Sequence, residues 1–424
     1  MIEGMLLSKT SRGAALVIAA GAALLCGAAA PAQSLLPPGR GAALIGSDLA
    51  VLEARESRKD LPCLVTPTRP VLGFDLKFHA GFEIAVPLRE LAGSENLLTI
   101  LFRVTSDKEK DNPAYFTQRI RVPSIDEDAK GEAYLQGAFD MGEGKYTVDW
   151  LMRDRTERVC ASFWESLAEL PTRDKPLELS AKPGELLASE KEEFADEPAV
   201  ERSTTDGALA VKVLVNFAPQ NWRASSLQPM DTSALVSMLR TLQRDPRVSR
   251  FSVVAFNLQE QRVLYRQPAE DRIDFPAIGE ALKGLQLGRV DAAKLRQKNS
   301  ETEFLGELIT AELRVQGELP DALIFAGPKV MLQENVAPET LRVVGEPAFP
   351  IFYMNYNLYP QMTPWRDTIG HAVKYFKGQE YTISRPRDLW FAVTEMVGKI
   401  VKLRSGKHPA TNASNGGTDE AVAH

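Results

Sequence analysis

The chain is poor in the two residue types that most often carry catalysis. Its 424 residues include four histidines and three cysteines. The histidines are scattered along the chain, and no two stand at the helical or hairpin spacing of a metal-binding pair. A Gly-x-Ser-x-Gly motif and a phosphate-binding glycine loop are also missing from the sequence. We therefore expect no catalytic residue, no metal, no cofactor and a non-enzymatic protein.

The N-terminus has the pattern of a secretory signal. Lys9 and Arg12 precede an apolar segment, Ala14 to Ala30, which is followed by small residues. We expect residues 1–32 to be a signal peptide that is cleaved after Ala32, and the mature chain to be secreted or periplasmic without a transmembrane segment. The alternative is a membrane span, but the apolar segment is shorter than the ~20 residues that a spanning helix needs.

Charge excludes two kinds of partner. The sequence contains 50 basic and 56 acidic side chains, and removal of residues 1–32 leaves 48 basic against 55 acidic ones. The mature chain is acidic and has no basic run, which argues against binding to nucleic acid or to an anionic membrane surface.

Cleavage would leave an even pair of cysteines. Cys26 lies in the signal segment, and lipidation there is disfavoured because Leu25 is not the small residue that normally precedes a lipidated cysteine. In an oxidising compartment Cys63 and Cys160 are expected to form one disulfide. It would close a loop of about 97 residues, which the chain-entropy model values at roughly 4 to 5 kcal/mol. The alternative is two buried thiols.

Residues 61–165 have the pattern of an all-β domain. Seven apolar or β-branched segments, a number and spacing typical of a sandwich, are separated by polar turns; they are Val71–Phe78, Phe82–Pro87, Leu97–Thr105, Tyr115–Val122, Ala133–Phe139, Gly144–Leu151 and Glu157–Phe163. The stretch Asp140 to Val148 resembles the corner before a late strand of immunoglobulin-like domains. There a tyrosine hydroxyl, here that of Tyr146, ties the strand to the preceding loop. We expect an immunoglobulin-like β-sandwich.

Two segments are expected to lack a packed core. Residues 166–207 combine prolines with charged and hydroxyl side chains, so we expect mostly an exposed linker, in which the portion from Leu177 to Leu187 could still pack on a neighbour. Residues 404–424 are low in apolar side chains and are expected to form a disordered tail.

Residues 208–403 have the element order of a doubly wound α/β domain. Apolar strands and amphipathic helices alternate along the chain; the main ones are Ala208–Val215, Asp231–Gln243, Phe251–Leu258, Asn299–Leu313, Asp321–Gly327 and Phe349–Tyr356. Their order and spacing resemble a von Willebrand factor A-like domain, which is Rossmann-like. The combination with an N-terminal immunoglobulin-like domain resembles secreted proteins of bacteria such as acidobacteria.

The resemblance also implies where a cation would bind. The family holds it with an Asp-x-Ser-x-Ser loop, a threonine and a second aspartate, an oxygen-rich set that suits Mg²⁺. Here the loop runs from Asn216 to Gln220, the threonine is Thr302, and the second aspartate falls on Ala326. No carboxylate remains, so we expect a metal-free domain. The alternative role for Thr302 is to cap a helix N-terminus.

Aromatic residues mark the expected working surface. Trp222 follows the first strand of the α/β domain, while Tyr356 and Trp365 lie at and after a later one. Loops at the carboxyl ends of such strands bind ligands. We expect these three side chains, with Asn216 and Gln220, to bind a protein partner. The alternative is that the aromatics only cover the sheet. The expected function is non-catalytic protein binding or scaffolding at the cell envelope, and the competing one is a hydrolase-like enzyme with an unrecognised site at the same loops.

Overall fold

The protein forms two compact units in the computed structural model. The structure describes residues 34–36, 46–189, 193–203, 208–222, 224, 226–285, 287, 299–314 and 318–407. The first unit lies within residues 1–71, 78–169 and 182–189, and the second within 72–77, 170–181 and 190–424. The predicted signal peptide, with Cys26, lies outside the described residues, as does most of the predicted tail.

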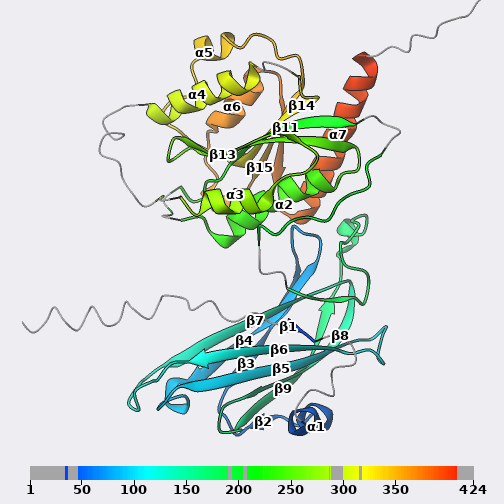
Figure 1. Ribbon diagram of the computed structural model, residues 1–424, viewed down its shortest axis with the longest axis vertical. Coiled ribbons are helices and arrows are strands. Elements are labelled where there is room, and N and C mark those ends of the chain that lie inside the picture. The colour runs from blue at the N-terminus through cyan, green and yellow to red at the C-terminus, as the bar shows by residue number, and fades with distance from the viewer. Residues whose placement is uncertain are drawn as a thin grey trace, which may run out of the picture. The chain divides into compact units, whose positions relative to one another are not determined.

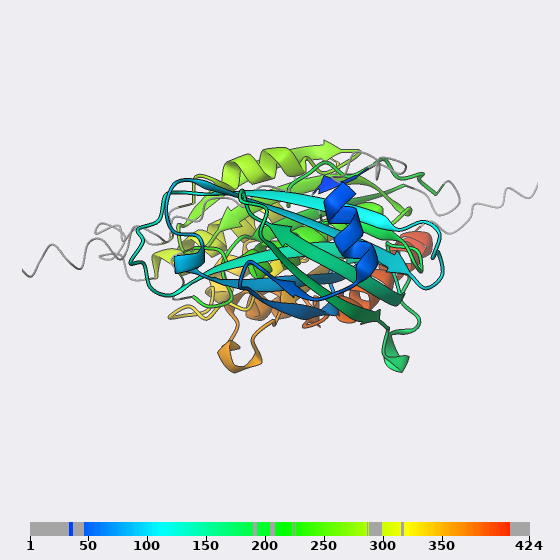
Figure 2. The ribbon, with the colours of Figure 1, turned by 90° about the horizontal axis from the view of Figure 1, so that it is seen from below.

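The first unit consists of two largely antiparallel sheets (Figure 1). The six-stranded sheet has the order β1-β6-β5-β8-β9-β2, and the four-stranded sheet has the order β10-β7-β4-β3. Helix α1 (Gly46–Ala54) packs against β5 and β8 (Figure 2). The strands are β1 (Ser34–Leu35), β2 (Arg58–Lys59), β3 (Leu64–Leu72), β4 (Phe78–Pro87), β5 (Asn96–Ser106), β6 (Ala114–Val122), β7 (Glu132–Met141), β8 (Gly144–Arg153), β9 (Val159–Ala168) and β10 (Leu186–Ala188).

Aromatic side chains join the two sheets of the first unit. Phe82 of β4 lies edge-on to Phe102 of β5 and to Trp150 of β8, with ring centroids 5.4 and 5.5 Å apart. The rings of Phe116 on β6 and Phe139 on β7 are 5.7 Å apart. All five side chains are fully buried. Alternate residues of each strand therefore supply one shared core between the sheets, as in a β-sandwich.

Most of the strand predictions for this unit are confirmed. Six of the seven predicted segments coincide with β4 to β9. The predicted strand Val71–Phe78 is wrong, because Gly73 and Lys77 pair across a turn and the preceding strand, β3, begins at Leu64. Two prolines within β3 hide the strand pattern, and they are tolerated because β3 is the edge of its sheet.

Two local predictions are confirmed in the first unit. The hydroxyl of Tyr146 donates a hydrogen bond to the carbonyl of Gly142 over 2.8 Å, which is the predicted corner. Cys63 and Cys160 form a disulfide, with their Cα atoms 6.3 Å apart.

The expectation of an exposed linker is wrong at residues 166–168 and around Glu197, whereas the packing that was allowed for Leu177 to Leu187 is observed. Strand β9 continues to Ala168, β10 adds to the four-stranded sheet beside β7, and Leu177 is buried. Within residues 193–203, Glu197 is buried and lies 2.8 Å from Arg240 and 2.7 Å from Arg244. A charged segment can therefore pack when its charges are paired. Residues 190–192 and 204–207 lie outside the described part of the chain.

The second unit is built on one six-stranded sheet of order β13-β12-β11-β14-β15-β16. Strands β11, β12, β14, β15 and β16 run parallel, and β13 returns antiparallel to β12 as a hairpin. The elements are β11 (Leu209–Asn216), α2 (Pro229–Arg244), β12 (Val248–Asn257), β13 (Arg262–Glu270), α3 (Phe275–Leu282), α4 (Ser300–Leu313), β14 (Ala322–Pro328), α5 (Pro338–Arg342), β15 (Ile351–Tyr356), α6 (Thr368–Tyr375), β16 (Gln379–Ile383) and α7 (Pro386–Lys407).

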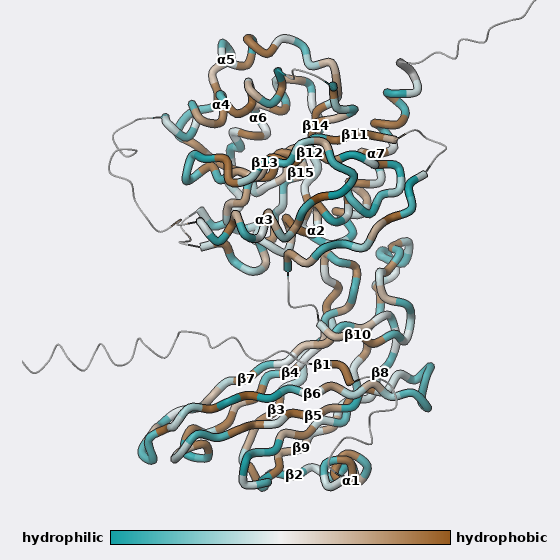
Figure 3. Tube along the Cα trace, in the orientation of Figure 1, coloured by the Kyte–Doolittle hydropathy of each residue, from teal (hydrophilic) through white to brown (hydrophobic). Residues whose placement is uncertain are grey.

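Helices cover both faces of this sheet (Figure 1). Leu235 of α2, Phe275 of α3 and Val393 of α7 belong to the core on one face, while Leu305 of α4 and Ile369 of α6 belong to the core on the other. Apolar residues follow the strands and polar residues gather at the turns (Figure 3). The unit is therefore a mixed α/β layer structure, with its central strands buried on both sides.

Helix α7 corrects the predicted tail. It continues through residues 404–407, which were expected to be disordered, and residues 408–424 lie outside the described part of the chain. Among the described residues, no helix is both long and apolar enough to cross a membrane.

Candidate functional site

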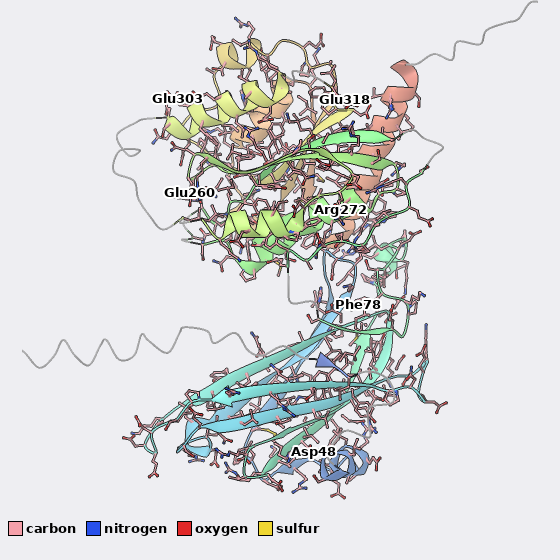
Figure 4. The ribbon with its side chains drawn as sticks, viewed as in Figure 1. Asp48, Phe78, Glu260, Arg272, Glu303 and Glu318 are labelled. Carbon is pink, nitrogen blue, oxygen red and sulfur yellow. A yellow bond between two sulfur atoms is a disulfide. The ribbon has the colours of Figure 1, made fainter. Side chains whose placement is uncertain are left out.

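The parallel strands of the second unit end at one edge of the sheet, where open α/β sheets bind their ligands. We call the segments that follow β11, β12, β14 and β15 the strand-end loops; they are residues 217–228, of which 223 and 225 are not described, 258–261, 329–337 and 357–367. Figure 4 labels Glu260 in the hairpin turn at this edge and Glu318 at the other end of the strands.

The loop after β11 is tied to its neighbour by buried hydrogen bonds. Asn216 is fully buried, and its Oδ1 accepts a hydrogen bond from the Leu258 amide over 3.2 Å. The Phe217 amide donates to the Phe256 carbonyl, and the Asn257 Nδ2 donates to the Phe217 carbonyl over 2.7 Å. Asn216, which the sequence resemblance aligned with a cation-binding aspartate, therefore joins β11 to β12.

Gln220 joins the same loop to the loop after β15. Its Oε1 accepts from the amides of Leu358 and Tyr359 over 2.7 and 3.1 Å, and its Nε2 donates to the Tyr359 carbonyl over 2.8 Å. Nearby, the Tyr356 hydroxyl donates to the Ala218 carbonyl over 2.6 Å. Gln220 and Tyr356 are 4% and 1% exposed. The prediction that Asn216, Gln220 and Tyr356 contact a partner is therefore wrong, because all three are buried and bonded within the unit.

The other two positions of the predicted cation site are also buried. Ala326 is buried in the core. Helix α4 begins at Ser300, so Thr302 lies inside its first turn, and its hydroxyl donates to the Glu334 carbonyl over 3.2 Å. The capping role considered for Thr302 is wrong, because Asn299 precedes the helix.

The carboxylate closest to this loop in sequence caps helix α2. Asp231 is buried, and its oxygens accept from the amides of Gln220 and Gln228 over 3.2 and 3.3 Å. Burial raises the pKa of Asp231, while those two amides lower it. Burial also raises the pKa of Tyr356 well above its usual value, and the charge of Asp231 adds to this. Asp231 and Gln228 form the capping box at the start of α2.

The two tryptophans of the predicted surface are exposed. The side chain of Trp222 is 69% exposed and that of Trp365 is 83% exposed. The backbone carbonyl of Trp222 accepts from Gln259 Nε2 over 2.9 Å, and the guanidinium carbon of Arg366 lies 5.4 Å from the Trp365 ring centroid. The loop of Trp222 is thus fixed by a hydrogen bond to its backbone. The ring of Trp365 contacts the guanidinium group of the next residue.

One further apolar side chain was missed. Met331 is 45% exposed in the loop after β14. This loop lies beside the Trp365 loop, because the Thr368 amide donates to the Val330 carbonyl over 2.7 Å and Arg366 donates to the Gln333 carbonyl over 2.8 Å. Met331 lies between Val330 and Leu332, and a run of three apolar residues has no periodicity that would show which of them is exposed.

Comparison with known proteins gives no family. No family model matches the chain, and no curated protein matches it. Among solved structures, proximal thread matrix protein 1 from the mussel byssus is 11% identical at a TM-score of 0.26, covering 47% of this chain and 46% of that one. A mutant of the PilB minor pilin from Streptococcus sanguinis is 7% identical at a TM-score of 0.27, covering 73% and 90%. A beta-glucuronidase from Bacteroides uniformis is 9% identical at a TM-score of 0.18, covering 74% and 38%.

The chain spans about half the length of the mussel protein and less than half of the glucuronidase. All three TM-scores lie below 0.5, so these likenesses establish neither fold nor function.

Proposed function

We propose that this chain is a secreted or periplasmic, non-catalytic protein that binds a protein partner through a metal-free von Willebrand factor A-like domain. The strand order β13-β12-β11-β14-β15-β16, with one antiparallel hairpin strand and helices on both faces, supports that fold for the second unit. The corner formed by Tyr146 supports an immunoglobulin-like sandwich for the first unit.

The observation that carries the binding function is the exposure of two large aromatic side chains on the strand-end loops. Trp222 and Trp365 are 69% and 83% exposed, and their loops are connected through Gln220 and residues 357–359. Tryptophan supplies a large contact area with few rotatable bonds, which is why it is common among the dominant residues of protein interfaces.

The buried polar side chains around the end of β11 favour binding over the competing hydrolase-like function. Hydrolysis needs polar side chains that converge on a substrate, whereas Asn216, Gln220 and Asp231 bond to neighbouring backbone. The Cys63–Cys160 disulfide supports an oxidising compartment, and with the N-terminal signal pattern it supports secretion or a periplasmic location.

The test is partner capture by the full mature chain. Bacterial envelope extract is passed over the immobilised protein, the retained partner is purified, and its affinity is measured by calorimetry. Trp222→Ala and Trp365→Ala should each weaken binding by about 2 kcal/mol, which is roughly 30-fold in Kd. The control is Tyr134→Ala, which removes a 75% exposed aromatic side chain of the first unit and should leave Kd unchanged. Equal affinity of both tryptophan variants and the parent chain would contradict the proposal.

A further inference from the structure

A groove lies between helices α4 and α5 of the second unit, which are neighbours in Figure 1. Its volume is about 800 Å³, within the range of sites that bind small ligands. One wall is a single face of α4, whose residues stand three or four positions apart, and the other wall comes from α5 and its end. The residues of the two walls are Glu307, Thr310, Ala311 and Arg314, and Thr340 and Val343. We call this hollow the α4–α5 groove.

Two contacts between the helices fix the shape of the groove. A Cβ atom placed on Gly306 would lie 3.1 Å from Thr340 Cγ2, so α4 and α5 approach closely at this point. Eight residues later, Arg314 donates from Nε and Nη2 to the Val343 carbonyl over 3.3 and 2.8 Å. A groove whose walls are already held together loses little conformational freedom when a ligand binds.

Two charges of opposite sign line the groove without a partner of their own. The third charged lining residue, Lys212 of β11, is already paired, because its Nζ lies 2.6 Å from Glu312 Oε2. Glu307 is exposed and makes no ion pair or side-chain hydrogen bond among the described residues. Arg314 has no carboxylate partner within the same residues, and its two bonds to a carbonyl leave further N–H groups available.

The separation of these two charges matches the length of a short peptide. Glu307 and Arg314 are seven residues apart along α4, which corresponds to about 10 Å along the helix axis. Between them the groove is lined by the methyl group of Ala311 and by Val343, which is 52% exposed. The groove therefore has a negative end, a positive end and an apolar centre.

We propose that the α4–α5 groove binds a free tripeptide of small apolar residues. Each residue of an extended chain spans about 3.4 Å, so three residues cover about 10 Å. The peptide ammonium pairs with Glu307, and the peptide carboxylate pairs with Arg314, whose planar guanidinium suits a carboxylate. Small side chains of the peptide contact Ala311 and Val343. This binding does not depend on partner capture, because no residue of the groove belongs to the strand-end loops.

The test is a calorimetric titration of the full mature chain with tri-L-alanine. Binding should be saturable. Acetylation of the peptide amine or amidation of its carboxylate should each raise Kd roughly 10-fold or more, because each removes a charged hydrogen-bonding group. Di-alanine and penta-alanine should bind more weakly than tri-alanine, because neither matches the separation of the two charges when it is extended.

Two variants separate a direct role from a structural one. Glu307→Gln should raise Kd for tri-alanine roughly 10-fold but leave Kd for the acetylated peptide unchanged, a pattern that a general loss of structure would not give. Ala311→Leu changes an exposed position, fills the groove without altering a charge and should abolish binding. The matched control is Glu303→Gln, which removes another exposed carboxylate of α4, labelled in Figure 4, that does not line the groove.

The control should bind tri-alanine like the parent chain. The proposal is overturned if the parent chain shows no saturable binding at millimolar tri-alanine, or if the capped peptides bind as tightly as the free one. It is also overturned if Ala311→Leu, folded by circular dichroism, binds like the parent chain. Partner capture through Trp222 and Trp365 is a separate measurement, so either result leaves the other proposal to its own test.

Discussion

Replacing Tyr146 with phenylalanine removes one hydroxyl from the core of the first unit and leaves the ring in place. Tyr146 is fully buried, and its hydroxyl donates to the Gly142 carbonyl over 2.8 Å. The change leaves no cavity of the size that a truncated side chain would leave. It does leave the Gly142 carbonyl without that donor. We expect a loss of about 1 to 1.5 kcal/mol in the free energy of unfolding at pH 7.

The same substitution should change how stability depends on pH. Burial raises the pKa of Tyr146 from 10 to about 12 in the folded state. As the pH rises above 10, the unfolded chain releases the phenolic proton first, so the parent chain loses stability between pH 10 and 12. The loss is roughly 1.4 kcal/mol at pH 11. Phenylalanine does not titrate, so the deficit of the variant should nearly vanish at pH 11.

Urea titrations of the full chain at pH 7, 9 and 11 measure this difference. The transition of the first unit is identified as the one that shifts when Cys160 is replaced. A deficit that is absent at pH 7 would refute the contribution of the hydrogen bond. A deficit that stays constant to pH 11 would refute the assignment of the raised pKa to burial of this hydroxyl.

Three other substitutions test separate features. Cys160→Ser removes a disulfide between residues 97 apart in sequence. In urea titrations it should lower the unfolding free energy of the first unit by roughly 4 to 5 kcal/mol. Two titratable thiols in the unfolded parent chain would show that no disulfide forms. Glu197→Gln removes the carboxylate that Arg240 and Arg244 share and should destabilise the second unit by about 3 kcal/mol. An unchanged urea midpoint would mean that the packing of residues 193–203 on the second unit adds little to its stability. Asn257→Ala removes two hydrogen bonds of 2.7 Å and should lower the unfolding free energy by roughly 2 to 3 kcal/mol, and a loss below that of Gln259→Ala would contradict this.

The sandwich strands were predictable because their apolar residues alternate, and alternation reports directly which face of a strand is buried. Apolar alternation did not identify β3, because Pro67 and Pro70 interrupt the pattern of this edge strand. It failed again around Glu197, because composition cannot show that Arg240 and Arg244, more than forty residues later, neutralise a buried charge. Periodicity is local, whereas charge pairing depends on the assembled fold.

Of the aromatic residues predicted to be exposed at the strand ends, two are exposed and one is buried. Tyr356 is the last residue of β15 and continues the alternation of Phe352 and Met354, all three of which belong to one core. Strand periodicity thus favours the interior for Tyr356, and the prediction of a partner-binding role overlooked it. Trp222 and Trp365 lie beyond strand ends, where no period applies, and only the structure shows that both are exposed.

The buried polar side chains of the strand-end loops suggest how the tryptophans would be presented to a partner. Gln220 lies two positions before Trp222 in the chain. It makes three hydrogen bonds of 3.1 Å or less to residues 358 and 359. A loop held in this way loses less conformational entropy when a partner binds. Gln220 would then act on affinity without touching the partner. In the proposed function, Trp222 would make the contact and Gln220 would order the loop that holds it. A position that the resemblance assigns to a cation-binding loop would then serve to fix the shape of that loop.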